Sequence, residues 1–384
     1  MKKIALISIL ALAIVGVFAL NISAVAETGG GMEITAFSAY LTDFNSGRVL
    51  FAKNENERHE IASMVKIMTA NLAFEAVERG ELSLDEDITV SETASSMGGS
   101  QMFLDANTAY KATDLIKGII IASANDASVA IAERLCGSHE AFVALMNERA
   151  AQLGMNDTKF CCATGLPDSG EQYSTARDVN IMTRQLMSHA KYYDYAGIWM
   201  EDYTHPSGRV TQLVNTNKLI RGYRGCIGGK TGFTNEAGFC LSAGAERDGV
   251  KVAATLIGGS DSKKRFAEVS AMFNYAFANY KSVTLYKAGA PLADRVAIKG
   301  GKTDSIAVAP ASDIAALMAT GDNKPEVTFE FNEGLKAPIA KGDEVGRAIL
   351  TDASSNQTVV PLISLDNVDK STFWDDIKRI LDLM

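Results

Sequence analysis

The segment from Ser63 to Arg79 carries apolar residues on almost every side of its predicted helix, and this limits the possible folds more than any other feature. The apolar positions are Met64, Val65, Ile67, Met68, Leu72, Phe74 and Val77, and the pattern ends at Gly80. A helix that is hydrophobic all round is stable only when other elements surround it. The chain must therefore build a layered domain around this helix, and its 384 residues are enough for two domains.

Strand and helix signals lie on both sides of this helix. A hairpin is predicted before it, from alternating runs at Ala36–Leu41 and Val49–Ala52. Helices are predicted after it at Thr113–Ile121, at Asp126–Leu135 with Asp126 as the cap, and after the capping box Thr175–Asp178. Gly228–Gly232, strands at Phe239–Ala245 and Lys251–Ile257, and a helix at Ser262–Tyr280 complete the series. We expect an α/β (α+β) domain over residues 33–282, with helices on both faces of a central sheet and a helical subdomain.

From about residue 283 the pattern changes to short alternating runs separated by glycine-containing turns. The runs are Val283–Tyr286, Val296–Ile298, Ile306–Val308, Val327–Phe331, Ala348–Thr351 and Val359–Ile363. Several short strands at this spacing are typical of a small all-β domain. We expect such a domain over residues 283–366.

Residues 1–26 have the pattern of an export signal. Lys2 and Lys3 precede an apolar run from Ile4 to Leu20, and Ala24-Val25-Ala26 forms a small-residue cleavage site. Cleavage after Ala26 would change the net charge from −9 to −11. The apolar run approaches the length of a short membrane span, so an uncleaved anchor is the alternative. Either way, the sequence predicts an exported protein at the outer face of the cytoplasmic membrane.

Residues 371–384 predict an amphipathic tail helix. Its apolar face comprises Phe373, Trp374, Ile377, Ile380, Leu381 and Met384. Such a helix can lie in a membrane interface, and we expect contact with the membrane surface. A terminal helix docked on its own domain is the alternative.

Composition excludes one class of partner and leaves the thiols open. The net charge of −9 offers no basic surface, which argues against nucleic acid. Five cysteines are an odd number, so at least one thiol is unpaired in the monomer. Cys161 and Cys162 are adjacent and unsuited to bridging each other, and we expect no required disulfide.

Several common hydrolase patterns are missing. The four histidines are scattered, without a His-Glu-x-x-His motif, so we expect no catalytic metal and no cofactor. No Gly-x-Ser-x-Gly elbow is present either. A serine hydrolase built from this chain needs a base other than histidine.

Ser63-Met64-Val65-Lys66 supplies such a base. A serine in the first turn of a helix gains from the positive end of the helix dipole. Lys66 follows three residues later, on the same helix face, and can reach the Ser63 hydroxyl. Burial would lower the pKa of this lysine and make it a base at neutral pH. The spacing alone is weak, because Ser188…Lys191 and Ser260…Lys263 repeat it.

Two further motifs follow in order. Ser123-Ala124-Asn125 lies between two predicted helices, and Lys230-Thr231-Gly232 lies on a strand before a hairpin. Ser-x-x-Lys, Ser-x-Asn and Lys-Thr-Gly in this order and context are the arrangement of β-lactamases and penicillin-binding proteins.

The chain resembles the low-molecular-mass penicillin-binding proteins, the serine-type D-alanyl-D-alanine carboxypeptidases of peptidase family S11. The stretches that carry the resemblance are Ile61–Thr69, Ser95–Ser100, Ile121–Ala127, Thr164–Asp168 and Lys230–Thr234. The resemblance extends from about Ala36 to the C-terminus and implies the penicillin-binding/β-lactamase-like transpeptidase fold, with the catalytic domain over residues 33–282.

The resemblance also implies a role for each motif residue. Ser63 is expected to be acylated, Lys66 to act as its base and Ser123 to pass a proton to the leaving D-alanine. The implied substrate-binding residues are Asn125, Lys230, Thr231, Gly232 and Phe233, with the backbone N–H groups of Ser63 and Phe233 as the oxyanion hole. Peptidoglycan stem peptides are the implied substrates, and β-lactam antibiotics the implied inhibitors.

The sequence departs from the family pattern at two positions. Thr216 stands where some relatives have an arginine that helps to bind the carboxylate, so recognition would depend more on Lys230 and Thr231. Val65 stands where many relatives have threonine, and we expect it to be tolerated. The glycine-containing loop Ser95–Ser100 either borders the site or forms a plain turn.

Two other functions remain alternatives. A class A-like β-lactamase shares this chemistry but normally has a Glu-x-x-Leu-Asn element, which is missing between Asn156 and Ser174. The other alternative is a non-catalytic penicillin-sensing or wall-binding protein, and the retention of Ser63 and Lys66 together argues against it.

Overall fold

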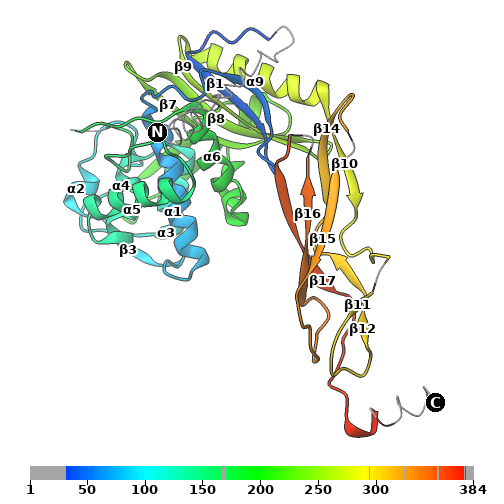
Figure 1. Cartoon of the computed structure of the whole chain (residues 1–384). Coiled ribbons are helices and arrows are strands. Elements are labelled where there is room, and N and C mark those ends of the chain that lie inside the picture. Colours follow the sequence, from blue (N-terminus) through cyan, green and yellow to red (C-terminus); the bar gives the residue numbers. More distant parts are fainter. Residues whose placement is uncertain are drawn as a thin grey trace, which may run out of the picture.

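The computed structural model describes residues 32–166, 170–293, 295–323, 325–352, 354–375 and 377. The predicted export signal lies outside these residues. Within them, no helix has the length and apolar character needed to cross a bilayer. Figure 1 shows a broad region of sheet and helices joined to a narrow region of β-strands.

An antiparallel five-stranded sheet is the centre of the broad region. Its strand order is β2-β1-β9-β8-β7. The strands are β1 (Ser38–Asp43), β2 (Val49–Lys53), β7 (Cys226–Thr234), β8 (Gly238–Arg247) and β9 (Val250–Gly259). The predicted first hairpin is β1–β2, and the predicted strands after residue 228 are β7, β8 and β9.

Helices cover both faces of this sheet, as predicted. Helix α9 (Ser262–Asn279) packs on β8 and β9 through one apolar core, and α6 (Ala176–Leu186) packs on the other face (Figure 1). The capping box before α6 is confirmed, because Thr175 Oγ1 accepts a hydrogen bond from Asp178 N (3.0 Å).

Helix α1 (Lys66–Glu78) is the buried helix that the sequence requires. Ten of its thirteen residues are buried, and it contacts α3, α4, α5 and α6. Its first turn is a 3-10 helix, η1 (Ala62–Val65), in which Val65 is fully buried. The other helices are α2 (Glu92–Ser95), α3 (Ala112–Ile121), α4 (Asn125–Cys136), α5 (His139–Gln152), η2 (Ala190–Tyr192), α7 (Tyr193–Ala196) and α8 (Leu219–Gly222).

The predicted cap of α4 is wrong. The N-cap position is Ala124, and Asp126 lies inside the first helical turn. Its carboxylate is buried and accepts hydrogen bonds from the backbone N–H groups of Met102 (3.2 Å) and Leu104 (3.0 Å). A loop distant in sequence therefore takes the carboxylate that the sequence pattern assigned to the helix end.

Two small two-stranded antiparallel sheets have no counterpart among the predicted strands. They are β3 (Asp87–Thr89) with β4 (Ala109–Lys111), and β5 (Met200–Thr204) with β6 (Val210–Val214). The β5–β6 hairpin packs on α3.

The narrow region begins at β10 (Tyr280–Tyr286), directly after α9. Its four-stranded sheet has the order β13-β17-β16-β15 and is accompanied by two-stranded pairs β10-β14 and β11-β12. The strands are β11 (Val296–Ala297), β12 (Ser305–Ile306), β13 (Val308–Pro310), β14 (Ile314–Ala319), β15 (Glu326–Phe331), β16 (Glu344–Thr351) and β17 (Gln357–Ser364). The prediction missed β14.

The two regions are joined by more than the chain. Arg48 on the β1–β2 hairpin pairs with Asp322 after β14 (2.6 Å), and both side chains are largely buried. The described C-terminal residues lie at the end of the narrow region farthest from the sheet (Figure 1). Phe373 and Trp374 are 72% and 74% exposed there. The predicted tail helix lies mostly outside the described residues and stays a prediction.

Candidate active site

Ser63 and Lys66 meet at the junction of η1 and α1. Lys66 Nζ lies 3.2 Å from Ser63 Oγ, within hydrogen-bond distance. The same Nζ donates a hydrogen bond to the carbonyl oxygen of Thr164 (2.6 Å). The serine–lysine pair that the sequence indicated is therefore formed, and a third residue orients the lysine.

Burial changes the acid–base chemistry of this lysine. The Lys66 side chain is fully buried, and burial lowers its pKa to about 7. A lysine with this pKa is neutral in a large fraction of molecules near pH 7 and can accept a proton. Lys191, at the same spacing from Ser188, is 60% exposed and pairs with Asp194, while Ser188 Oγ donates to Gln185 O. The same spacing thus carries a buried lysine beside Ser63 and an exposed, ion-paired lysine after Ser188.

Two glycines allow neighbouring segments to approach the Ser63 turn. A Cβ on Gly165 would lie 2.1 Å from the carbonyl oxygen of Ala62, and a Cβ on Gly232 would lie 2.6 Å from that of Ile61. Gly165 also has a φ of +84°. Any larger residue at either position would push the Thr164 loop or β7 away from the serine.

Ser123 lies in the tight turn between α3 and α4, and Asn125 is the first residue of α4. Ser123 adopts a left-handed backbone conformation with a φ of +61°, which is strained for a residue other than glycine. Both residues are buried, and Ser123 Oγ and Asn125 Oδ1 have no hydrogen-bond partner. Buried polar atoms are rarely left unpaired. These two atoms are therefore available to a bound molecule.

The glycine-containing loop Ser95–Ser100 borders this turn. Asn125 Nδ2 donates to Gly98 O (2.7 Å), and the Asn125 backbone N–H donates to Ser100 O (2.7 Å). Of the two roles considered for the loop, contact with the site is the one that the structure shows.

Lys230 and Thr231 lie on β7 and are both buried. Lys230 Nζ donates to Thr231 O (2.9 Å). Burial lowers the pKa of Lys230 well below its usual value, and the charges of Lys66 and Arg265 lower it further. An anionic ligand would relieve this condition, because it would supply the missing counter-charge.

Thr216 occupies the position where the sequence departs from the family. Thr231 Oγ1 donates to Thr216 Oγ1 (2.8 Å), and the Thr216 backbone N–H donates to Ile121 O (3.1 Å). Thr216 therefore contacts β7 at Thr231, and it brings a hydroxyl group where some relatives are expected to have a charged arginine.

Phe233 follows Gly232 at the end of β7. Its ring is 49% exposed and stacks on Phe239 with the ring centroids 4.3 Å apart. The assignment of the Ser63 and Phe233 N–H groups to an oxyanion hole stays a prediction.

The sequence analysis missed Arg265. It lies on α9, largely buried, and donates through Nη1 to Gly232 O (3.0 Å) and Cys240 O (3.3 Å). Its Nε is buried without a partner. A basic residue one position before Phe266, on the apolar face of α9, was the available signal.

Among the described residues, no histidine or cysteine side chain is hydrogen-bonded to Ser63, Lys66 or Lys230. His189 pairs with Glu78 (2.7 Å) and His139 Nε2 accepts from Ala163 N (3.1 Å). All five cysteines are free thiols. Cys162 Sγ accepts from the Gly165 N–H (3.2 Å) and thus supports the turn that holds Lys66.

Two family models match the chain. The model described as D-alanyl-D-alanine carboxypeptidase, peptidase S11, matches residues 23–261. The model described as penicillin-binding protein 5, C-terminal domain, matches residues 280–370.

Curated relatives match over most of the length. The chain is 37% identical over 348 residues to the D-alanyl-D-alanine carboxypeptidase DacF of Bacillus subtilis, covering 90% of this chain and 89% of that protein. It is 30% identical over 370 residues to the D-alanyl-D-alanine carboxypeptidase DacC of Escherichia coli, covering 93% and 91%.

Solved structures share the fold. Penicillin binding protein 5 from Haemophilus influenzae matches with a TM-score of 0.66 and 29% identity, covering 88% of this chain and 98% of that chain. A carboxypeptidase DacD from Francisella tularensis matches with a TM-score of 0.65 and 27% identity, covering 88% and 95%. The predicted transpeptidase-type fold followed by an all-β region is therefore confirmed.

Proposed function

The chain belongs to the peptidase S11 family of D-alanyl-D-alanine carboxypeptidases and is a serine-type enzyme of that class, and we propose that Ser63 is its acylated nucleophile. The observation that carries the proposal is the buried Lys66, whose Nζ lies 3.2 Å from Ser63 Oγ. Burial lowers the pKa of Lys66 to about 7, so it can accept the serine proton near neutral pH.

The reaction begins with proton transfer from Ser63 to neutral Lys66. Ser63 Oγ attacks the carbonyl carbon between the last two D-alanines, and the developing oxyanion is stabilised by the N–H groups of Ser63 and Phe233. Ser123 Oγ passes its proton to the leaving D-alanine and takes up the proton that Lys66 received, so Lys66 is neutral again. In deacylation, Lys66 accepts a proton from the attacking water and returns it to Ser63 Oγ as the acyl bond breaks.

The remaining site residues bind the substrate. Lys230 and Thr231 receive the terminal carboxylate, which supplies the counter-charge that buried Lys230 lacks. Asn125 binds the peptide backbone through its side-chain amide, and Gly232 lets this substrate-binding strand lie close to the Ser63 turn. Peptidoglycan stem pentapeptides end in the required D-alanyl-D-alanine. A β-lactam would acylate the same serine, and this acyl-enzyme would be hydrolysed slowly.

The family favours this function over the two alternatives. A class A-like β-lactamase needs rapid deacylation, and the Glu-x-x-Leu-Asn element for it is missing. A non-catalytic penicillin sensor does not require the two unpartnered atoms of Ser123 and Asn125.

Release of D-alanine from an acyl-D-alanyl-D-alanine peptide tests the proposal. Wild-type protein should release D-alanine, and Ser63→Ala should not. Ser188→Ala is the matched control, because Ser188 has the same spacing to a lysine but lies in an ordinary turn. Release that survives in Ser63→Ala would disprove the role of this serine.

We also propose export and division of labour along the chain. Residues 1–26 act as the export signal, residues 33–282 as the catalytic domain, and residues 283–366 as a spacer. Peptidoglycan lies outside the cytoplasm, which agrees with export. N-terminal sequencing of the mature protein should find Glu27 first; a chain that retains residues 1–26 would instead be anchored.

Membrane contact through residues 371–384 is the last part of the proposal. Support comes from the two exposed aromatic residues, Phe373 and Trp374, at the far end of the narrow region. Co-sedimentation with phospholipid vesicles should be lost in a Phe373→Ser/Trp374→Ser variant. Equal sedimentation of the variant would contradict the membrane role.

A further inference from the structure

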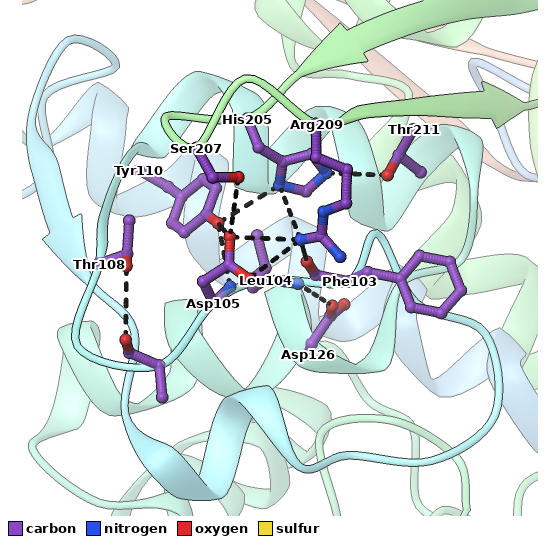
Figure 2. Close-up of polar contacts among 11 residues, drawn as sticks. Phe103, Leu104, Asp105, Thr108, Tyr110, Asp126, His205, Ser207, Arg209 and Thr211 are labelled. Atoms are coloured by element: carbon purple, nitrogen blue, oxygen red, sulfur yellow. Dashed lines mark hydrogen bonds and ion pairs between the residues drawn. The ribbon is translucent and has the colours of Figure 1, made fainter.

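The tip of the β5–β6 hairpin is tied to the loop that follows Ser100. Figure 2 shows Arg209 and His205 of the hairpin facing Asp105 and Tyr110. Arg209 Nη2 pairs with Asp105 Oδ1 (3.2 Å) and also donates to the carbonyl oxygen of Phe103. One guanidinium thus joins the two segments through a side chain and a backbone carbonyl.

Uncharged groups complete this contact. The Tyr110 hydroxyl donates to Asp105 Oδ2 (3.1 Å) and accepts from the Asp105 backbone N–H (3.0 Å). His205 lies beside the tyrosine, with its Nδ1 3.3 Å from the hydroxyl, and its Nε2 lies 2.8 Å from Thr211 Oγ1. Both rings are buried, so the base of the contact is shielded from water although the ion pair itself is half exposed.

The loop is held in a strained conformation. Phe103 has a φ of +62° and a ring that is 53% exposed. The backbone N–H groups on either side of it, those of Met102 and Leu104, donate to the Asp126 carboxylate. Strained residues persist only where the surroundings hold them, and such positions concentrate near functional sites. Asp126 and Arg209 together provide this hold.

The Gly98–Asp105 loop is hydrogen-bonded to Asn125, a residue proposed to bind substrate. Gly98 O and Ser100 O accept hydrogen bonds from the side chain and the backbone of Asn125. The hydrogen bond to the Gly98 carbonyl therefore fixes the orientation of the Asn125 amide. In this orientation Asn125 Oδ1 has no hydrogen-bond partner. A displacement of the loop would turn this amide.

The base of the hairpin continues to the other wall of the site. Thr216 lies two residues after β6, and its hydroxyl accepts from Thr231. The hairpin thus connects the strand that receives the carboxylate with the loop that orients Asn125.

We infer that Arg209 and Asp105 are positioning residues that lock the β5–β6 hairpin on the Gly98–Asp105 loop and so fix the Asn125 amide relative to Thr231. The inference rests on the proposed function, because it assigns a consequence to Asn125 as a substrate ligand. Neither residue touches the reacting atoms. They act by fixing the distance and orientation of the Asn125 amide relative to Thr231.

A positioning role of the Arg209–Asp105 pair and a merely stabilising role predict different effects on rate and on melting temperature. A half-exposed ion pair contributes little to stability. A small displacement of a substrate ligand can cost far more in rate. Removing the pair should therefore change catalysis more than it changes the melting temperature.

The test compares Arg209→Ala with a matched pair in the narrow region. Arg295 Nη2 pairs with Asp366 (2.8 Å) and donates to Ser305 O (3.0 Å), so it makes the same two kinds of contact at similar exposure. Arg295→Ala is the control. The readouts are the second-order rate of acylation by a fluorescent penicillin, kcat and KM for D-alanine release, and the melting temperature.

Arg209→Ala should lower the acylation rate about five- to tenfold and raise KM, and Asp105→Asn should lower the rate about threefold. The double variant should match Arg209→Ala, because both substitutions break one contact. The acid limb of the pH profile should be unchanged, since Lys66 is untouched. Arg295→Ala should acylate at the wild-type rate.

Three results would overturn the inference. Arg209→Ala and Asp105→Asn could both acylate at the wild-type rate, or Arg295→Ala could show the same loss. If Arg209→Ala fails to fold, the isosteric Asp105→Asn variant decides by itself. A wild-type protein that releases no D-alanine would instead overturn the proposed function, and this inference with it.

Discussion

The region before Tyr280 and the region after it differ in what they bury. The first contains buried Lys66, Lys230 and Arg265 together with many buried hydroxyl and amide groups. Among the residues that the structure describes after Tyr280, Ser364 is the only buried polar or charged one. All the buried polar atoms found without a partner also lie in the first region.

Burying a polar group without a partner costs free energy, and burying a charge costs more. Among its described residues, the narrow β region avoids both. The first region contains two buried lysines and the unpartnered Ser123 Oγ, and in the proposed function these are the groups that bind substrate or transfer protons. Function is thus visible as a local departure from good packing.

The largest expected effect is at Lys66, where one substitution should lower activity and raise stability. Lys66→Met should lower kcat/KM at least about a thousandfold, because the general base is lost. The folded-state pKa is about 7 against 10.5 in the unfolded chain, so the unfolded state binds more protons between these values. Wild-type stability therefore decreases as pH falls from about 10.5 to 7 and stays reduced below.

The same variant should consequently be more stable than wild type at pH 7, by about 1 to 3 kcal/mol, although it loses the bond to Thr164 O. Urea unfolding at pH 7 and pH 10 measures this difference. If Lys66→Met were less stable than wild type at pH 7, burial of Lys66 would not reduce the free energy of unfolding.

The next effect concerns the core of the narrow region. Leu362→Ala on β17 removes a fully buried side chain and should destabilise this region by about 2 to 5 kcal/mol, with acylation by penicillin unchanged. Leu241→Ala on β8, opposite Thr231, is the matched core variant and should lower both stability and acylation. Calorimetry and acylation rates distinguish the two. Equal loss of acylation in both variants would contradict the claim that only the region before Tyr280 takes part in catalysis.

A smaller effect follows from pH. Only neutral Lys66 accepts the serine proton, so kcat/KM should fall on the acid side with a midpoint near pH 7. At pH 6 the rate should be about tenfold below its plateau. A profile of D-alanine release between pH 5 and 9 measures it. An acid limb near pH 4 would assign the base to a carboxylate instead.

The smallest effect is expected at Thr216. Its hydroxyl accepts one hydrogen bond from Thr231, so Thr216→Ala should raise KM about threefold and leave kcat nearly unchanged. Thr216→Ser keeps the hydroxyl and should restore the wild-type value. If Ser and Ala behave alike, the contact does not assist carboxylate binding.

Local signals predicted the parts of the fold that depend on local physics. The all-round apolar pattern after Ser63 and the Thr175 capping box both gave correct helices. Strand β14 was missed because its run of Ile314, alanines, Leu317 and Met318 lacks alternation, and only pairing with β10 makes it a strand.

The site divides in the same way. Ser63, Ser123 and Lys230 were found because their motifs are short and ordered. Arg265 and the Thr164 carbonyl were not, because each contributes through tertiary contact alone. Asp126 was misassigned for the same reason: its carboxylate binds a loop more than twenty residues away in sequence.

The most direct test of the account is the location of a penicillin adduct by tryptic mass spectrometry. The tryptic peptide from His59 to Lys66 has Ser63 as its only hydroxyl-bearing residue, so a mass increase on this peptide assigns the acylated atom. We expect the adduct on this peptide in the wild-type protein and none in Ser63→Ala. An adduct on any other peptide, or none in active wild-type protein, would contradict the assignment of Ser63 as the nucleophile.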